Sequence, residues 1–260
     1  MTTTTTPLLQ VRGIQKSYGD RVALHDASFD LWPGEVLAVV GESGSGKSTL
    51  LNAVAARSLP DAGSVQFQNR TGTLQEVYAM SEAERRLLAR TDWGFVHQNA
   101  ADGLRMDVSA GANVGERLMG LGERHYGRLR TTAQDWLQRV EIDPVRIDEA
   151  PRAFSGGMRQ RLQIARNLVT QPRLVFMDEP TSGLDVSVQA RLLDLLRQLT
   201  RQMQLAVIIV THDLAVARLL AHRMMVMQRG RVVESGLTDQ VLDDPQHPYT
   251  QLLVSSVLQP

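Results

Sequence analysis

A ten-residue run, "GESGSGKSTL", places small residues and one lysine directly behind the apolar run "VLAVV". The spacing of Gly41, four residues, Gly46, Lys47 and Ser48 fits a phosphate-binding loop, in which backbone N–H groups wrap the phosphates of a nucleotide and the lysine neutralises them. Larger side chains would push the phosphates away from the backbone. The sequence therefore predicts nucleotide contacts from Gly41, Glu42, Ser43, Gly44, Ser45, Gly46, Lys47, Ser48 and Thr49.

Two carboxylates, Asp178 and Glu179, follow the apolar run "LVFM" and precede Pro180. Phosphoryl transfer requires compensation of negative charge and an oriented nucleophile. The first carboxylate can hold Mg²⁺, usually through water, and the second can polarise the attacking water. Because the same chain carries a phosphate-binding loop, we expect this pair to serve hydrolysis of the nucleotide rather than only to begin a turn.

The stretch "FSGGMRQRLQIARNL" places Ser155, Gly156 and Gly157 at the start of a predicted helix. Exposed N–H groups and the helix dipole make such a start a second phosphate site in the same chain. One nucleotide does not need two such sites. We therefore expect the protein to pair head to tail, so that this helix caps the γ-phosphate bound to the partner's loop. A glycine turn that feeds an ordinary helix is the alternative.

The elements that position these residues follow from the hydrophobic spacing. Residues 8–40 alternate short apolar runs with turn signals, as antiparallel strands do, and after Lys47 the spacing becomes helical. Ser81 and Glu84 have the spacing of a capping box before another helix. From about residue 99 to 169, helical patterns separated by Gly and Pro predict an inserted helical subdomain.

The second half of the chain returns to short apolar runs, "RLVFM" before Asp178 and "LAVIIV" before Thr211. Such runs are typical of buried parallel strands, and an open α/β sheet binds its ligand at their carboxyl ends. The run "MMVM" is expected in a strand core rather than as a set of sulfur ligands. We predict an α/β fold with a frayed tail at 1–7, one domain at 8–240 and a C-terminal tail of that domain at 241–260.

The composition of the 260 residues limits the possible partners. Lys+Arg and Asp+Glu both number 28, so no basic excess favours nucleic acid or an anionic membrane. The few aromatic residues are too scattered for a single-stranded nucleic acid platform. The absence of cysteine excludes disulfides and thiolate metal sites. Because no apolar run approaches the roughly 18 residues of a membrane span and the N-terminus lacks signal-peptide features, we expect a soluble, cytoplasmic protein.

Seven motifs, read in order, resemble those of the ATP-binding cassette (ABC) ATPases: Tyr18, "GESGSGKST", Gln98, "FSGGM", "LVFMDEP", "SGLD" and His212 in "VTHD". The resemblance covers about residues 8–236. It implies a P-loop NTPase fold, with a RecA-like core, an antiparallel β subdomain and an inserted α-helical subdomain. It also implies ATP and Mg²⁺.

The resemblance gives roles to the residues that match these motifs. Tyr18 would stack on adenine, and Lys47 would contact the β- and γ-phosphates. Ser48 and Gln98 would ligate Mg²⁺, beside the carboxylate of Asp178.

For hydrolysis, the resemblance makes Glu179 the general base, with Gln98 beside it in the catalytic set. His212 would orient the γ-phosphate and the lytic water. Asp185 in "SGLD" would lie at the seam of the dimer.

One motif departs from the family. The signature most often reads Leu-Ser-Gly-Gly-Gln, and here Phe154 and Met158 replace its first and last residues. The serine and both glycines remain, so we expect ATP to be sandwiched between two cassettes. Without the glutamine amide, turnover is expected to be slow.

Two branches of the family are similar to this chain. The phosphate loop and the tail "DDPQHPYTQLLVSSVL" resemble the ATP-binding subunits of peptide and nickel importers. After Gln98 those importers usually continue with a Ser-Leu-Asn-Pro stretch that faces the transmembrane partner, whereas this chain has "NAADGLRMDVSAGANVGERLM". That stretch, with "YAMSEAERR", "RHYGRLRTTAQDWLQRVEI" and "RIDEAPRAFSGGM", resembles the ATP-binding protein of the carbon–phosphorus lyase system for phosphonate breakdown.

The second resemblance implies two kinds of partner. One is a second ABC subunit, either an identical copy or a paralogue, and the other is a soluble carbon–phosphorus lyase complex that ATP-driven closing would remodel or open. The rival hypothesis is an importer motor bound to a membrane permease. A third is a nucleotide-gated clamp with negligible turnover.

Overall fold

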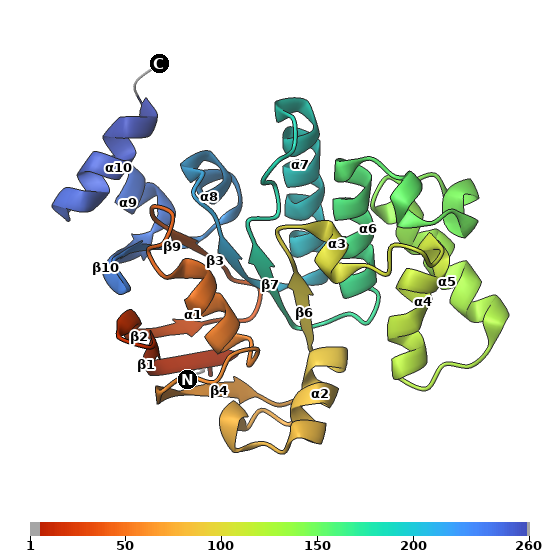
Figure 1. Ribbon diagram of the computed structural model, residues 1–260, viewed down its shortest axis with the longest axis horizontal. Helices are drawn as coiled ribbons and strands as arrows, with labels where there is room; N and C mark the ends of the chain where they lie inside the picture. The colour runs from red at the N-terminus through yellow and green to blue at the C-terminus, as the bar shows by residue number, and fades with distance from the viewer. Residues whose placement is uncertain (1–5, 259–260) are drawn as a thin grey trace, which may run out of the picture. The chain divides into compact units, whose positions relative to one another are not determined.

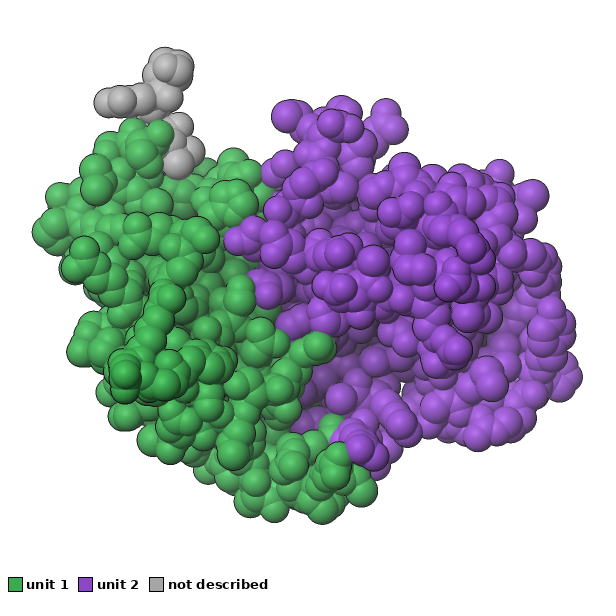
Figure 2. All heavy atoms as spheres, viewed as in Figure 1, with its two compact units in different colours: residues 1–85, 204–260 green, residues 86–203 purple. Residues whose placement is uncertain are grey.

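The computed structural model describes residues 6–258. The chain forms two compact units, residues 1–85 with 204–260 and residues 86–203 (Figure 2). Of the predicted frayed tail, residues 1–7, only Thr6 and Pro7 lie within the described residues, and neither belongs to a helix or strand.

The first unit combines a sheet with several helices (Figure 1). Its elements, with α2 continuing into the second unit, are β1 (Leu9–Tyr18), β2 (Arg21–Leu31), β3 (Val36–Val40), α1 (Lys47–Val54), β4 (Ala62–Gln68), β5 (Leu74–Glu76), the 3₁₀ turn η1 (Val77–Ala79), α2 (Glu82–Thr91), β8 (Ala206–Val210), α8 (Leu214–Leu220), β9 (Arg223–Gln228), β10 (Arg231–Leu237), α9 (Thr238–Asp243) and α10 (Pro248–Leu258).

The sheet of the first unit has the strand order β5-β4-β1-β2-β10-β9-β3-β8. At one end β5, β4, β1 and β2 pair antiparallel. The alternating pattern of residues 8–40 predicted this correctly for β1 and β2 but wrongly for β3, which pairs parallel because it lies buried between β8 and β9. Leu9 lies opposite Leu31 and Val11 opposite Phe29, and all four side chains are buried. Cross-strand apolar pairs of this kind fix the register, because a slip by one residue would turn them to solvent.

At the other end of this sheet, β3 pairs parallel with β8 and β9. Every residue of β3 and of β8 is buried, which explains why their sequences are continuous apolar runs. Met224 to Met227 of β9 are at most 1% exposed, so the "MMVM" run is strand core, as predicted. The N–H of Thr211 donates to the carbonyl of Val39, so β3 and β8 end side by side.

The second unit joins two parallel strands to a group of helices (Figure 1). Its elements are β6 (Trp93–Val96), α3 (Ala100–Gly103), α4 (Ala110–Gly120), α5 (Tyr126–Arg139), the 3₁₀ turns η2 (Pro144–Asp148) and η3 (Pro151–Ala153), α6 (Gly156–Leu168), β7 (Leu174–Asp178) and α7 (Val186–Met203). The helices α3 to α6 occupy the stretch from which a helical subdomain was predicted. The limits proposed for that subdomain, for the domain and for its C-terminal tail stay predictions.

Local signals predicted helix starts better than helix ends. The capping box is formed as predicted, because the carboxylate of Glu84 accepts the N–H of Ser81 at 2.7 Å and the Ser81 hydroxyl accepts the N–H of Glu84 at 3.3 Å. The helix after the phosphate loop, in contrast, ends at Val54 although helical spacing continues to Arg57. Ala56 has a left-handed backbone, with φ 54°, which stops the helix.

Candidate functional site

The phosphate loop leaves β3 at Gly41 and enters α1 at Lys47. Its glycines are required by close backbone contacts. A Cβ at Gly41 would collide with the carbonyl oxygen of Met227, and one at Gly46 would lie 2.6 Å from the carbonyl oxygen of Ala23. Both glycines have positive φ, 147° and 103°, which other residues rarely adopt.

Lys47 is the cation of this loop and is only 5% exposed. Its ammonium donates to the carbonyls of Gly41 and Glu42, both at 2.8 Å. Gly46 caps α1 without a side-chain hydrogen bond, and the hydroxyl of Ser45 is buried without a hydrogen-bond partner among the described residues. A buried ammonium, a helix start without a side-chain cap and an unpaired hydroxyl fit the phosphates of a nucleotide.

Two further predicted residues of the first unit lie at strand ends. Tyr18 ends β1, is 55% exposed and pairs across the turn with Arg21. The guanidinium of Arg21 would lie 3.7 Å from a Cβ built on Gly44, so Arg21 is a neighbour of the loop that sequence reasoning missed. His212 is exposed and follows β8, beside the end of the strand that leads into the loop.

The two predicted acids of the second unit stand at the end of β7. Asp178 is the last residue of the strand, and Glu179 has a left-handed backbone, with φ 42°, an unusual conformation for this residue type that recurs at functional sites. The amide of Gln98 donates to the Glu179 carboxylate at 3.3 Å and to the Ser182 hydroxyl at 3.2 Å. The structure thus brings Gln98 and Glu179 together, and adds Ser182, which sequence reasoning missed.

Buried amides of α6 hold the strand end that precedes Gln98. Gln163, fully buried, accepts the N–H of His97 at 2.5 Å and donates to the carbonyl of His97 at 3.2 Å. Asn167 accepts the N–H of Phe95 at 3.1 Å. Because a buried amide without partners would be costly, these bonds fix the backbone at the start of the Gln98 loop. The helical spacing of "RQRLQIARNL" gave no sign of this role.

The predicted second anion site is the start of α6. The hydroxyl of Ser155 caps the helix by accepting the N–H of Met158 at 3.3 Å, and Ser155 and Gly156 are exposed. Gly157 is buried, and a Cβ there would collide with the side chain of Val188 in α7. The glycine is therefore needed for packing within the unit. Asp185 is exposed just before α7, and its place at a dimer seam stays a prediction.

One arginine packs against both residues that depart from the usual signature. The guanidinium of Arg146 lies 4.7 Å from the ring centroid of Phe154, and its Nη1 lies 3.3 Å from the sulfur of Met158. Glu149 binds the same guanidinium through two hydrogen bonds of 2.9 and 2.6 Å, which raise the pKa of Arg146. The start of α6 is thus supported by a fixed cation where the family usually has a glutamine amide.

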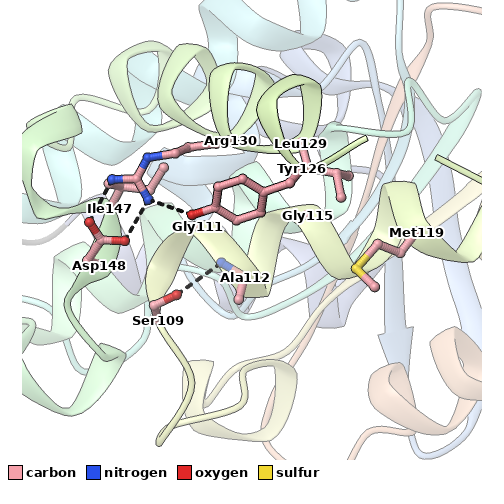
Figure 3. A pocket seen from close by; sticks show the side chains of 10 residues that line it. All are labelled: Ser109, Gly111, Ala112, Gly115, Met119, Tyr126, Leu129, Arg130, Ile147 and Asp148. Atoms are coloured by element: carbon pink, nitrogen blue, oxygen red, sulfur yellow. Dashed lines mark hydrogen bonds and ion pairs between the residues drawn. The ribbon is translucent and has the colours of Figure 1, made fainter. Parts of the chain in front are cut away.

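A cavity of about 150 Å³ lies elsewhere in the second unit, between α4, α5 and η2 (Figure 3). Its walls are mostly apolar, with the ion pair of Arg130 and Asp148 at one end. None of the predicted site residues lines it. The lining residues are Ser109, Gly111, Ala112, Gly115, Met119, Tyr126, Leu129, Arg130, Ile147 and Asp148.

Two kinds of feature were not found among residues 6–258. No group of three or more His, Asp or Glu side chains there could hold a metal ion by itself. The predicted metal set would therefore have to combine the oxygens of Ser48, Gln98 and Asp178 with phosphate oxygens, which Mg²⁺ also binds in nucleotide sites. No described helix is long and apolar enough to cross a membrane.

Comparison with known families gives two matches. The family described as "ABC transporter" matches residues 24–182, and the one described as "Oligopeptide/dipeptide transporter, C-terminal region" matches residues 233–260.

Among curated relatives, the phosphonates utilization ATP-binding protein PhnK of Escherichia coli (strain K12) is 66% identical over 97% of this chain and 98% of its own length. The di/tripeptide transport ATP-binding protein DppF of Pseudomonas aeruginosa (strain UCBPP-PA14) is 38% identical over 94% of this chain and 74% of its own length.

Solved structures include two close neighbours. The ATP-binding cassette MJ0796, as a dimer in a post-hydrolysis state with ADP and Pi, has a TM-score of 0.79 and 28% identity over 88% of this chain and 98% of its own. CbiO1 of Clostridium perfringens, part of the ABC transporter complex CbiONQ, has a TM-score of 0.80 and 27% identity over 92% of this chain and 91% of its own. Both likenesses confirm the fold class predicted from the sequence.

Proposed function

Since the chain belongs to the ATP-binding cassette family of ATPases, we propose that it couples ATP hydrolysis to a soluble carbon–phosphorus lyase complex in phosphonate breakdown. One observation carries this proposal. The relative named for phosphonates utilization is 66% identical over nearly the full length of both chains, whereas the peptide transport relative is 38% identical. We propose that this coupling takes place in the cytoplasm, where a soluble lyase could bind the cassette.

The chemistry that we propose starts at the phosphate loop. Lys47 would exchange its two backbone carbonyls for the β- and γ-phosphates of ATP, and Tyr18 would stack on the adenine. Magnesium, bound through Ser48, Gln98 and Asp178, would supply charge compensation for the phosphates.

Glu179 would then accept a proton from the attacking water as general base. The amide of Gln98, which donates to the Glu179 carboxylate at 3.3 Å, supports this role because it keeps the carboxylate oriented. His212 would orient the γ-phosphate and the water. Positioning and electrostatics of this kind supply most of the catalysis in phosphoryl transfer.

We also propose that two cassettes pair head to tail, with Asp185 at the seam. The start of α6, with Ser155 and Gly156 exposed, would then cap the nucleotide on the partner's loop. Support comes from MJ0796, which is dimeric in its post-hydrolysis state. The partner is either an identical copy or a paralogue, since both would offer the same two sites.

The second candidate is a motor of a peptide-type importer. It is favoured by the match of residues 233–260 to the C-terminal region of oligopeptide/dipeptide transporters. The same closing motion would then move a membrane permease. A nucleotide-gated clamp is the third candidate. Glu179→Gln separates it from a motor, because a clamp keeps working without hydrolysis whereas a motor stalls in its closed form.

The decisive experiment is affinity purification of tagged Glu179→Gln with Mg·ATP and without detergent. Slow hydrolysis should hold the closed state and its partners together. We expect lyase subunits to be recovered with the chain. Recovery of only a membrane permease, after detergent extraction, would instead establish the importer motor and leave the proposed chemistry of ATP intact.

A further inference from the structure

The C-terminal segment of the chain is tied to β10 by one carboxylate. Glu234 accepts the N–H groups of Gln246 and His247 at 2.9 and 3.0 Å. Burial raises the pKa of Glu234, but hydrogen bonds, those from Gln246 and His247 among them, outweigh it and bring the pKa below its ordinary value, so the carboxylate is charged at neutral pH. The loop before α10 is therefore held by charge-assisted bonds.

The residues that follow position Tyr249 against the phosphate loop. The Nδ1 atom of His247 accepts the N–H of Tyr249 at 3.1 Å, and Pro248 occupies the first position of α10, where a missing N–H costs nothing. The half-buried Tyr249 side chain then places its hydroxyl 2.9 Å from the backbone nitrogen of Glu42, which donates to it. This distance is that of an ordinary hydrogen bond.

Glu42 is the residue on which the loop's internal bonds converge. Its carbonyl accepts the ammonium of Lys47 at 2.8 Å and the N–H of Ser45 at 3.2 Å. Its N–H is taken by Tyr249. When Lys47 leaves its carbonyls for phosphate, it releases Glu42 on one side only, because the bond to Tyr249 does not involve the lysine.

We propose that Tyr249 is a positioning residue of the phosphate loop, which keeps the backbone at Glu42 in its binding conformation and makes the C-terminal segment part of the nucleotide site. The inference rests on the proposed function, in which this loop binds the phosphates of ATP. A loop held in one conformation loses less entropy on binding, so the hydroxyl should favour ATP binding without entering the chemical step.

The test is Tyr249→Phe in the full-length chain, which removes only the hydroxyl. Loss of one neutral hydrogen bond corresponds to an increase of about two- to tenfold in the Kd for Mg·ATP and in KM, with kcat at saturating ATP unchanged. In ¹⁵N-labelled protein, the amide proton of Glu42 should move upfield, because it has lost its acceptor. Binding is measured with a fluorescent ATP analogue.

Two further variants, a matched control and a variant of the phosphate loop, separate the possible outcomes. Tyr126→Phe removes the hydroxyl of an exposed tyrosine in the second unit, which lies 3.4 Å from the guanidinium of Arg130, and should change neither Kd nor the Glu42 resonance. An unchanged Kd or Glu42 resonance in Tyr249→Phe, or a fall in its kcat, would overturn the role of Tyr249 but leave the proposed function of the loop intact. Wild-type ATP binding by Lys47→Ala would instead overturn the proposed function of the loop.

Discussion

Ser155 lies at a position with two proposed roles. Its hydroxyl caps α6, and the exposed start of that helix is proposed to contact the partner's ATP. We expect Ser155→Arg to bind ATP with a Kd within about twofold of wild type, because the phosphate loop is intact. Its side chain would fill the space in front of the helix, so turnover should fall more than tenfold. Steady-state ATPase assays and nucleotide titration measure the two effects separately.

Ser155→Ala is the control for this variant. It removes the cap, worth about 0.5–2 kcal/mol of helix stability, without adding bulk. Turnover in Ser155→Ala should therefore lie between those of wild type and Ser155→Arg. Hydrolysis at the wild-type rate by Ser155→Arg would show that the start of α6 does not act across a dimer.

Met158 offers Arg146 only a thioether, which is a weak acceptor. In Met158→Gln the amide could accept from Arg146 and still direct its N–H₂ group outward. One added hydrogen bond that forms only in the closed, hydrolysing state would raise kcat about two- to tenfold. Steady-state kinetics test this prediction, with Met119→Gln, on the exposed surface of α4, as the matched control. An equal or slower kcat would mean that Arg146 already replaces the glutamine.

The turn after α1 depends on a tyrosine from the next element, η1. The hydroxyl of Tyr78 contacts the carbonyls of Ala53 and Ser58, the latter at 2.9 Å. We expect Tyr78→Phe to lower the free energy of unfolding by about 0.5–1.5 kcal/mol, since the hydrogen bond from the hydroxyl to these carbonyls is lost. Urea unfolding at pH 8 measures the change, and Tyr126→Phe should be close to wild type.

The same tyrosine predicts a dependence on pH. Burial raises the pKa of Tyr78 above its ordinary value of 10.0. Below pH 10 the phenol is protonated in both the folded and the unfolded chain, so its contribution to stability is constant. Above pH 10 the unfolded chain loses the proton first, and stability falls as the pH rises. Urea unfolding between pH 9 and pH 11 should show a shallower fall in Tyr78→Phe than in wild type.

Elements with a strong local pattern were predictable from sequence. The apolar runs of β3, β7 and β8 and the capping box at Ser81 each depend on neighbouring residues, and the structure confirms them. Helix ends were less so, because the left-handed backbone of Ala56 has no glycine to announce it. The motif of the phosphate loop could be found without the fold, because binding a phosphate requires small residues and a lysine at fixed spacing.

Contacts between distant residues were not predictable. Glu42 and Tyr249 are 207 residues apart, and only the folded sheet brings β10 and its C-terminal segment to the loop. Arg146 and Met158 meet because η2 returns to the start of α6. A lone tyrosine or arginine in a polar stretch gives no signal of its partner, so these contacts required the structure.

At the scale of the whole molecule, the proposed chemistry is divided between the two compact units. The phosphate loop, Tyr18 and His212 belong to one, and Gln98 and Glu179 belong to the other. Neither unit carries both a phosphate-binding loop and a general base. In the proposed mechanism, hydrolysis requires residues from both stretches of the chain, and the start of α6 serves the nucleotide of a second cassette.

This division leads to a prediction on assembly. Glu179→Gln should bind Mg·ATP without hydrolysing it, so the closed pair should accumulate. Light scattering after size exclusion should give a mass of 28.8 kDa without nucleotide and twice that mass with Mg·ATP. Adding Lys47→Ala or Ser155→Arg to Glu179→Gln should keep the mass at that of one chain, since the first removes the nucleotide and the second blocks the shared interface.

The formal net charge of zero at pH 7 bears on the same measurement. Like-charged chains repel, but here no net repulsion opposes pairing, so the nucleotide rather than the salt concentration should decide the mass. If the partner is an identical copy, the dimer should form with this chain alone. If Glu179→Gln stays monomeric with Mg·ATP at every salt concentration and pairs only after a second cassette is added, the partner is a paralogue. A monomer under both conditions would contradict the head-to-tail mechanism itself.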